Sequence, residues 1–321
     1  SNTRTSTKSD GNKVMYLIYI GLAVVTGLTL AAETALNAQL SALLKSPIIA
    51  CFVAYTVGTI ILFCMTIMIG DFQKIQNLFS APILPLTGGL FGLIFVMSCI
   101  ILFPKIGAVE TVMLPTLGQI LSGMLFETVG WFSLPVINLS ISRVGGLFIL
   151  LIGIYVAIVM PAKVSKQASM VSIPIKKSAQ LLNRIWAFVA GVLCTVQSIL
   201  NGQLANDVGS STVSAFWVFF IGFVVLMCLR QNSLRKLWLG IKLVPAWLAG
   251  TTGALFVTFM SMLILPLGPG LTVSISTLGV MVGAILVQQF GLFQSVRENI
   301  SRYQIIGIIT MLFGIIIIKI L

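Results

Sequence analysis

Histidine is absent from the 321 residues of this sequence. Its absence excludes a histidine-based catalytic triad and any metal site that depends on imidazole ligands. The cysteines all lie in apolar runs, without the spacing of a metal site or a disulfide framework. We interpret them as small hydrophobic residues and expect no metal, no cofactor and no enzymatic activity. They are Cys51, Cys64, Cys99, Cys194 and Cys228.

Charged residues are also scarce, at 8% of the chain, whereas 58% of the residues are hydrophobic. Soluble domains carry about 25% charged residues, so a soluble fold of this composition would have too little polar surface to cover its core. The apolar runs are continuous, which excludes a transmembrane β-barrel, because its strands are short segments of alternating polarity. The sequence therefore predicts a multi-pass protein of the cell (inner or plasma) membrane, surrounded by lipid.

Acidic residues number only 7 against 19 basic ones, which gives a net charge of +12. Such a charge could indicate nucleic acid binding, but the basic residues cluster in loops and at the ends of apolar runs. This pattern is typical of the cytoplasmic loops of membrane proteins. We therefore expect anionic membrane lipids, and no nucleic acid, as partners of these loops. The distribution favours both termini on the outer side, a preference that depends on one central loop.

Ten apolar runs are long enough to cross a bilayer, and a polar segment divides them into two sets of five. We expect a disordered polar tail over 1–13, a first five-helix repeat over 14–161, a basic linker over 162–183 and a second repeat over 184–321. The predicted spans are 15–43, 47–70, 82–104, 107–130 and 142–161 in the first repeat, and 185–205, 211–230, 243–266, 270–291 and 303–321 in the second.

The two sets resemble each other in sequence. "NAQL", which begins at Asn37, matches "NGQL", which begins at Asn201, at an offset of 164 residues. "TLGQ" at 116–119 matches "TLGV" at 277–280 at an offset of 161. An odd number of helices in each repeat makes the second repeat enter the membrane in the opposite sense, an arrangement that supports alternating access in transporters. The predicted fold is an all-α integral membrane protein with ten transmembrane helices as two inverted five-helix repeats.

A glutamate in the first predicted helix is the leading candidate for a functional site. Glu33 lies deep in an apolar run, where an ionised acid costs about 2.5–3.5 kcal/mol at the bilayer centre and therefore usually faces a cavity or a partner. Asn37 lies one turn further along the same face. Gln197 and Asn201 stand at the matching places of the second repeat. These four residues could bind protons or substrate; alternatively, Glu33 is interfacial and the amides join helices.

Two further sets of residues could belong to the same site. Glu127 follows Gln119 by eight residues in the fourth predicted helix, and both could bind protons or substrate. Aromatic residues of the second helix of each repeat could line a cavity, although aromatic packing would also explain them; they are Tyr55, Phe52, Phe216 and Trp217. Small residues one turn apart, such as Gly279 and Gly283, indicate close helix packing and leave both a monomer and a homodimer possible.

These motifs together resemble the YdcZ-type branch of the drug/metabolite transporter (EamA-like) superfamily, in its fused two-repeat form. The likeness rests on the paired "NAQL" and "NGQL" segments and on "GQILSGMLFETVG" at 118–130, and it covers nearly all of 14–321. Members have five-helix repeats, as separate or fused chains. The resemblance implies export of small organic compounds, often coupled to protons or cations.

The sequence departs from the family pattern at four places. The pattern has glutamine at the place of Glu33 and aspartate at the place of Glu127, and the second half carries Val280 and Gln288 where the first has Gln119 and Glu127. The second half would then mainly support or shape the substrate site. The Ala32–Glu33 pair is also similar to the first helix of small multidrug-resistance exporters.

We therefore expect a secondary active transporter that exports a small organic metabolite or a cationic drug with proton coupling. A flippase for a lipid or lipid-linked substrate and a passive channel are the alternatives. A membrane enzyme would require a nucleophile–base pair or a metal set, for which the sequence offers few groups.

Overall fold

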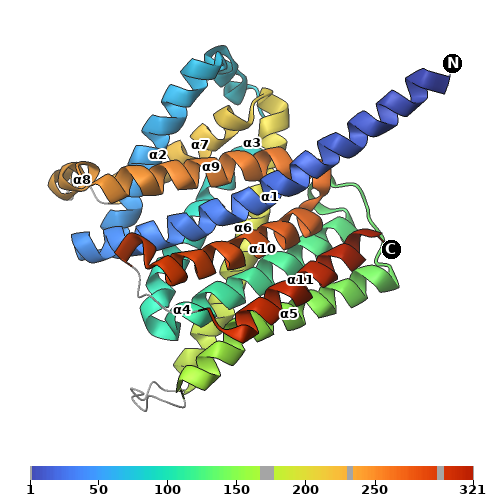
Figure 1. Cartoon of the computed structure of the whole chain (residues 1–321). Coiled ribbons are helices and arrows are strands. Elements are labelled where there is room, and N and C mark those ends of the chain that lie inside the picture. Colours follow the sequence, from blue (N-terminus) through green and yellow to red (C-terminus); the bar gives the residue numbers. More distant parts are fainter. Residues whose placement is uncertain (1, 167–176, 230–233, 295–299, 321) are drawn as a thin grey trace.

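The structure is a computed structural model that describes residues 2–166, 177–229, 234–294 and 300–320, and within these ranges its regular secondary structure is helical (Figure 1). The helices are α1 (Asn2–Leu44), α2 (Pro47–Ile69), η1 (Phe72–Phe79), α3 (Ile83–Leu86), α4 (Gly88–Val129), η2 (Trp131–Ser133), α5 (Ile141–Lys166), α6 (Lys177–Val208), α7 (Ser211–Leu229), α8 (Leu234–Ile241), α9 (Val244–Leu267), α10 (Pro269–Phe290), η4 (Leu292–Gln294) and α11 (Arg302–Ile320).

Helix ends follow local sequence signals, as α2 shows. Ser46 is its N-cap, with a side-chain oxygen that accepts a hydrogen bond from the amide of Ile49, and Pro47 occupies the first turn, where its missing N–H costs nothing. Gly70 ends the helix with φ of 83°, a left-handed conformation that glycine adopts without steric cost. The apolar run that the sequence predicts over 47–70 is therefore one helix with defined ends.

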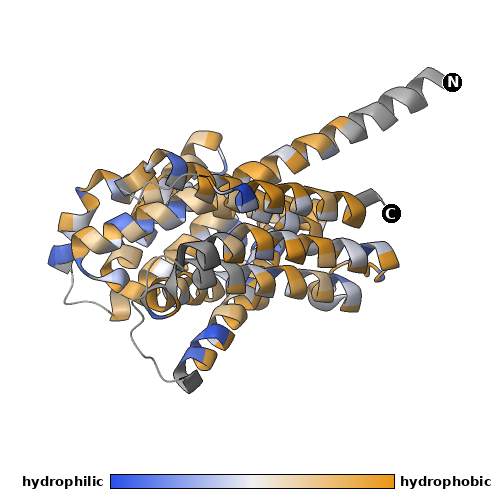
Figure 2. Ribbon diagram, turned by 60° about the horizontal axis from the view of Figure 1, so that its bottom comes forward, coloured by the Kyte–Doolittle hydropathy of each residue, from blue (hydrophilic) through white to orange (hydrophobic). Residues whose placement is uncertain are grey.

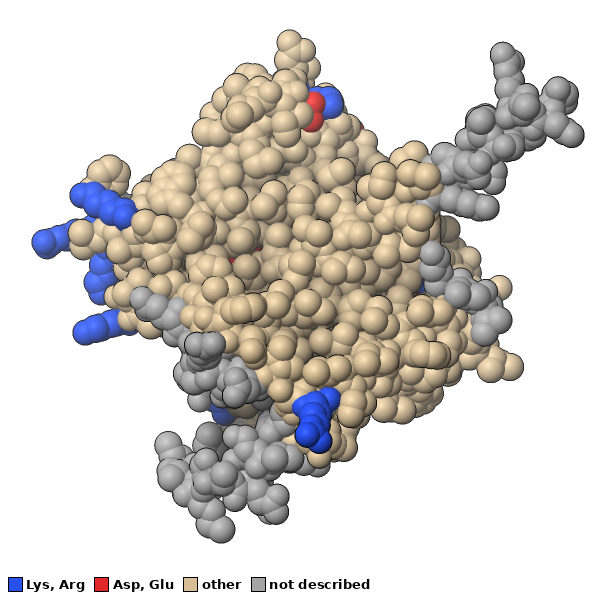
Figure 3. Space-filling model, in the orientation of Figure 1, with Lys and Arg blue, Asp and Glu red and all other residues tan. Residues whose placement is uncertain are grey.

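Seven helical stretches of the described chain are long and apolar enough to cross a membrane. They are Val14–Leu44, Pro47–Ile69, Ile83–Leu102, Gln180–Val208, Ser211–Leu229, Val244–Leu267 and Pro269–Val287, and Ile141–Ala157 and Arg302–Ile318 are shorter apolar stretches. Hydrophobic residues make up most of the length of these helices (Figure 2), and the charged side chains lie mainly at the edges of the face that Figure 3 shows. The remaining expected span, 107–130, includes side chains at 107–113 that lie outside the described part.

The expected spans 82–104 and 107–130 fall mostly in one helical segment, α4, whose two ends both pack on α6. Gly92 contacts Gln197, and Ser98 accepts a hydrogen bond from the Trp186 indole at 2.8 Å, so this part of α4 runs antiparallel to α6. Further along, Gly118 contacts Phe188 and the Gln119 carbonyl accepts from Thr195. The order of partners is reversed, so α4 turns back between Ser98 and Pro115.

Matched backbone conformations and contacts demonstrate the internal repeat in three dimensions. Gly130 and Phe132 have φ of 72° and 56°, and their counterparts 161 residues later, Gly291 and Phe293, have φ of 59° and 55°. Gly27 packs against the Ser276 carbonyl, and Gly191 packs in the same way against Pro115. The two repeats therefore share both local turns and the partners that each presents to the other.

The most extensive helix packing in the described part joins one repeat to the other. α4 packs on α6, α5 on α11, α1 on α9 and α10, and α2 on α7 and α9; α5 and α11 lie side by side along one edge of the bundle (Figure 1). In that pair Gly146 packs against the Gly314 carbonyl and Gly153 against the Gly307 carbonyl. The halves are interleaved rather than placed next to each other as separate bundles.

The boundaries differ from the expected ones at two places. α1 begins at Asn2, inside the expected tail 1–13, because a helix extends readily once its apolar part has nucleated it. The expected linker 162–183 is shortened, since α5 continues to Lys166 and α6 starts at Lys177. Residues 167–176 lie outside the described part of the chain.

Candidate functional site

Glu33 lies on α1 where this helix packs against α9. A methyl group added at Gly253 would stand 2.8 Å from a carboxylate oxygen of Glu33, so the glycine leaves the space that the acid occupies. The side chain of Asn37, one turn later, interacts with the Glu33 carboxylate. The predicted pair is therefore one unit, on a helix face turned toward the second repeat.

Gln197 occupies the matching place on α6. Its amide packs against Gly92 of α4, and the residue numbers differ from those of Glu33 and Gly253 by the repeat offsets of 164 and 161. Each polar side chain thus lies over a glycine of the opposite repeat. The surroundings are alike, but an amide replaces the acid.

Asn37 and Asn201 share a further property. Asn37 is 7% exposed and Asn201 2% exposed, and the side-chain oxygen of each is buried without a hydrogen-bond partner among the described residues. The oxygen of Asn201 lies against Gly88, where a side chain would collide with it. An unpaired buried acceptor costs about 1–3 kcal/mol, so each of these oxygens is an acceptor for a donor from water or a ligand.

An aromatic pair lies near Glu33. The rings of Tyr55 on α2 and Phe219 on α7 have centroids 5.0 Å apart. Gly58 packs against Phe219 and Gly222 against Tyr55, again at matched places. Phe219 packs on the same glycine as Glu33, since a methyl group at Gly253 would stand 3.2 Å from its ring.

Titratable groups from three helices surround Glu33. Its charge acts on Cys51 and Tyr55 of α2, on Cys99 of α4 and on Cys194 of α6. These neighbours are thiols and a phenol, and they bring no basic side chain to the carboxylate. The centre of the molecule therefore carries one potential negative charge, held among groups that are neutral near pH 7.

The remaining predicted aromatic residues lie in other surroundings. Phe52 is fully buried and stacks on Phe223 at 6.0 Å, Phe216 packs on Phe63 and Phe220, and the Trp217 indole donates to the Leu86 carbonyl. These contacts describe packing between α2, α7 and α3. Among the four expected aromatic residues, Tyr55 is the one that the contacts bring to Glu33.

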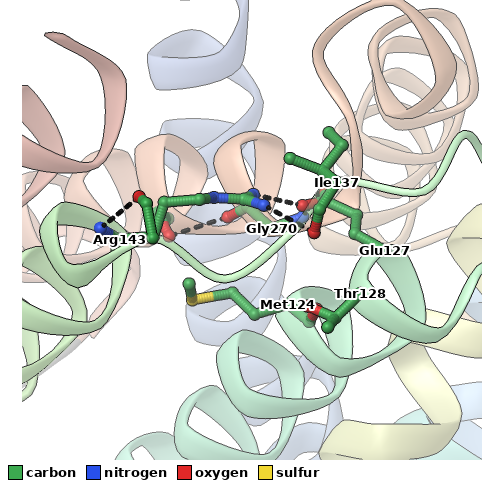
Figure 4. A network of polar contacts seen from close by, with 8 residues as sticks. Met124, Glu127, Thr128, Ile137, Arg143 and Gly270 are labelled. Carbon is green, nitrogen blue, oxygen red and sulfur yellow. Dashed lines mark hydrogen bonds and ion pairs between the residues drawn. The ribbon is translucent and has the colours of Figure 1, made fainter. Parts of the chain in front are cut away.

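Glu127 belongs to a separate polar network (Figure 4). One carboxylate oxygen accepts a hydrogen bond from the Gly270 amide at 2.7 Å, and the other forms an ion pair with Arg143. Glu127 is 1% exposed, and Arg143 also donates to the Ile137 carbonyl at 3.4 Å. Because α4, α5 and the start of α10 meet here, the geometry gives Glu127 a role in joining helices of both repeats.

Sequence reasoning missed four members of these two sites. Phe219 could have been found from the repeat, because it stands 164 residues after Tyr55. Gly92 and Gly253 are related by the other offset, 161, but no local pattern says that they lie under Gln197 and Glu33. Arg143 ends an "ISR" segment that recurs at Arg302, but this repeat carries no signal that Arg143 pairs with Glu127. Among the described residues, no group of three or more His, Cys, Asp or Glu side chains is arranged to hold a metal ion.

A family profile matches the chain over residues 18–156 and again over 182–317, and its description is "Putative inner membrane exporter, YdcZ". The search of curated proteins found no match. A solved crystal structure, whose title reads "Crystal structure of protein", is 16% identical, with a TM-score of 0.63 over 94% of this chain and 96% of its own. At this identity, the similarity supports the fold alone.

Proposed function

The chain belongs to the YdcZ family of inner membrane exporters, and on that premise we propose that it is a proton-coupled secondary transporter that exports a small organic cation or metabolite. It is a multi-pass transporter of the inner membrane. The proposal adds the substrate class, the coupling ion and the arrangement of ten transmembrane helices as two inverted repeats. The folding back of α4 and the matched contacts of the two repeats support that arrangement.

The observation that carries the proposal is one acid at the centre of an otherwise matched pair of sites. Glu33 lies over Gly253 as Gln197 lies over Gly92, and of the two side chains only the acid can take up a proton. Glu33 forms no ion pair within the described part of the chain, and an ionised carboxylate among apolar membrane helices is costly. Binding either a proton or a cation removes that cost, so the two ligands compete for the same group.

This competition supplies a mechanism for exchange. When the site faces the cytoplasm, Glu33 releases its proton and binds the cationic substrate. When the site faces outward, a proton displaces the substrate from Glu33. The protonated carboxyl group then returns to the side that faces the cytoplasm. Because the empty ionised site is the least stable form, conversion between the two states occurs mainly with one ligand bound, which couples the flows.

Transport in liposomes tests this function. The native chain should exchange protons for organic cations from a panel that includes both ammonium and quaternary ions, measured above protein-free liposomes. Glu33→Gln should reduce flux driven by a pH gradient by about tenfold or more. Asp207→Asn makes the same chemical change at an exposed residue at the end of α6 and should leave flux unchanged.

Unaltered coupling in Glu33→Gln would overturn the proposal, and unsaturable flux without proton dependence would indicate a channel. Uptake of lipid analogues in place of the cations would indicate a flippase.

A further inference from the structure

We propose that the short helix α8, together with Lys45, binds the headgroups of anionic phospholipids at one surface of the membrane. None of its residues belongs to the site assigned to transport, so this binding goes beyond the proposed function and does not depend on it. The basic and aromatic side chains that α8 exposes carry the inference.

One face of α8 is fixed to the helix bundle. The helix contacts α1, α2 and α9. Leu237 and Gly240 are buried, and Gly240 packs against Leu44 at the end of α1. The Trp247 indole of α9 donates a hydrogen bond to the Ile241 carbonyl at 2.9 Å. α8 is therefore held in a defined orientation, and its other face points away from the bundle.

The outward face of α8 carries basic and apolar side chains together. Arg235 and Lys236 are exposed, as are Trp238 and Leu239 with exposed fractions of 64% and 53%. The Lys242 ammonium lies 5.5 Å from the centre of the Trp238 ring. Tryptophan is enriched at the headgroup level of membranes, and long basic side chains reach from apolar surroundings to the headgroups. This face is therefore typical of a helix at the membrane surface.

The positive charge at this end of the molecule has no acidic partner within the described part of the chain. Lys45 directly follows Leu44, the residue that contacts Gly240, and Lys and Arg side chains gather where α8 lies (Figure 3). The described ion pairs include none of these basic residues. The acids with described side chains lie elsewhere, with Glu33 over Gly253, Asp71 beside Lys74, Glu127 beside Gly270 and Asp207 at the end of α6. The uncompensated charge therefore calls for an anion from outside the chain.

The exposed apolar groups identify that anion as a lipid headgroup rather than a dissolved ion. Trp238 and Leu239 stand among the basic residues, where a lipid can cover them with its acyl chains while its phosphate meets the cations. A free phosphate or a nucleic acid would leave both side chains in water. Clusters of Lys and Arg next to membrane helices are attracted to anionic lipids in this way.

The counterpart of α8 in the first repeat lacks the free charge. η1 covers 72–79, and a shift of 162 residues gives 234–241, the bounds of α8. η1 also exposes aromatic side chains, since Phe72 is 52% and Phe79 92% exposed. Its lysine, Lys74, is however paired with Asp71 at 2.6 Å. The two segments therefore share an exposed apolar surface but differ in net charge.

These two segments lie at opposite ends of one helix pair. Phe52 of α2 stacks on Phe223 of α7, whereas Phe63, further along α2, packs on Phe216, which comes earlier in α7. The order of contacts is reversed, so the helices are antiparallel. η1 follows the end of α2 and α8 follows the end of α7, which places the anionic-lipid site on one side of the molecule only.

Lipid binding to the purified full-length chain in detergent tests the proposal by native mass spectrometry. Phosphatidylglycerol and phosphatidylcholine with the same acyl chains differ in headgroup charge, and the native chain should prefer the first by about tenfold or more. The double variant Arg235→Gln/Lys236→Gln should reduce this preference by about fivefold or more. Lys74→Gln/Lys105→Gln removes the same number of charges outside α8 and should leave the preference unchanged.

Two further comparisons separate the apolar contribution from the charge. Trp238→Ser should weaken the binding of both lipids by a similar factor, because it removes apolar contact and leaves the cations in place. Glycerol phosphate, which lacks acyl chains, and a short single-stranded oligonucleotide should not displace phosphatidylglycerol at equal concentration. Lys45→Gln, a single change in a loop, should lower the preference if the double variant fails to fold.

Equal affinity of the native chain for the two lipids would overturn the inference. Equal loss of preference in the two double variants would also overturn it, since binding would then follow net charge and not α8. Displacement by glycerol phosphate would show a site for soluble anions, and displacement by the oligonucleotide a site for nucleic acid, and either result would contradict a lipid site. Proton-coupled flux is measured separately, so its failure would leave this inference standing.

Discussion

Glu33 and Gln197 occupy equivalent positions of the two repeats, and their side chains differ only in that an amide nitrogen of Gln197 replaces a carboxylate oxygen of Glu33. Both side chains lie over a glycine of the opposite repeat and one turn before a buried asparagine. The surroundings are alike, so the difference in chemistry lies in the carboxylate itself. Moving the acid from one position to the other should therefore preserve much of its function.

Exchange of these two residues tests that expectation. Glu33→Gln alone should reduce proton-driven flux by about tenfold or more, a change in barrier of at least about 1.4 kcal/mol. Adding Gln197→Glu to that variant should restore a large part of the flux, because the acid then lies over Gly92. The measurement is initial uptake into liposomes with an imposed pH gradient. Gln197→Glu alone is the control for a second acid, and a double variant no more active than Glu33→Gln would contradict the equivalence.

At the scale of elements, helix ends and loops hold the two repeats together through polar groups. Glu127 near the end of α4 contacts the start of α10 and pairs with Arg143 near the start of α5. On another part of the molecule, Lys74 of η1 forms an ion pair with Asp71 at 2.6 Å and donates to the Gly209 carbonyl beyond α6. The first pair is buried and the second is partly exposed, so the two should contribute very differently to stability.

Removal of one partner of the buried pair should be strongly destabilising. Glu127→Gln leaves Arg143 with an uncompensated buried charge, and we expect a loss of about 3–5 kcal/mol in the free energy of unfolding. Arg143→Met should cost a similar amount, and the double variant less than the sum of both, as measured by denaturant unfolding in mixed micelles. Lys74→Met, at the exposed pair, should cost less than about 1 kcal/mol. Additive losses at Glu127 and Arg143 would show that the pair does not act as a unit.

Asp71 predicts a dependence of stability on pH. Hydrogen bonds from Lys74 and Ser210 hold the pKa of the Asp71 carboxyl below its usual value. A lowered pKa in the folded state means that the contribution is fully present above the ordinary pKa of about 3.9 and is lost as pH falls through the lowered value. The difference in unfolding temperature between the native chain and Asp71→Asn should therefore shrink from pH 6 toward pH 3. A constant difference across this range would contradict the assignment.

The membrane-protein class and the internal repeat can be predicted from the sequence, because both depend on long, regular patterns. Low charge and continuous apolar runs predict membrane helices, and the 164- and 161-residue offsets predict the contacts that Gly27 and Gly191 make. The pairing of Asn37 with Glu33 is also predictable, since both share one helix face. The partners Gly253 and Arg143 are not, because contacts between distant helices depend on how the helices cross. The sharp turn within α4 is likewise not predictable, and it places two predicted spans, 82–104 and 107–130, mostly in one helical segment.

At the scale of the whole molecule, the interleaved packing of the repeats makes each half depend on the other. Glycines of α1, α4, α5 and α6 lie directly against backbone of the opposite half. A half expressed alone would expose these close-packed faces to lipid, with voids where the partner helix should lie. Folding of this protein should therefore be an assembly of two halves rather than of two independent domains.

A split chain tests this dependence. Residues 1–166 and 177–321, expressed together, should copurify through a tag on one half and bind ligands as the intact chain does. Each half expressed alone should be degraded or aggregated, as judged by membrane yield and gel filtration. A version that carries Gly27→Val should fail to assemble, because its side chain would collide with the Ser276 carbonyl, whereas Gly21→Val, with open space around it, should not. Stable, monodisperse single halves would contradict the interleaved fold.

The reciprocal contacts of α5 and α11 have a consequence for how such a protein can change over evolutionary time. Gly146 meets Gly314 as Gly307 meets Gly153, so the interface would be satisfied equally by two copies of one five-helix chain. In such an ancestor every substitution would appear twice, and an acid at the centre would bring a second acid with it. Joining the copies into one polypeptide ends that constraint. It allows a single carboxylate to stand opposite an amide, which identical subunits cannot achieve.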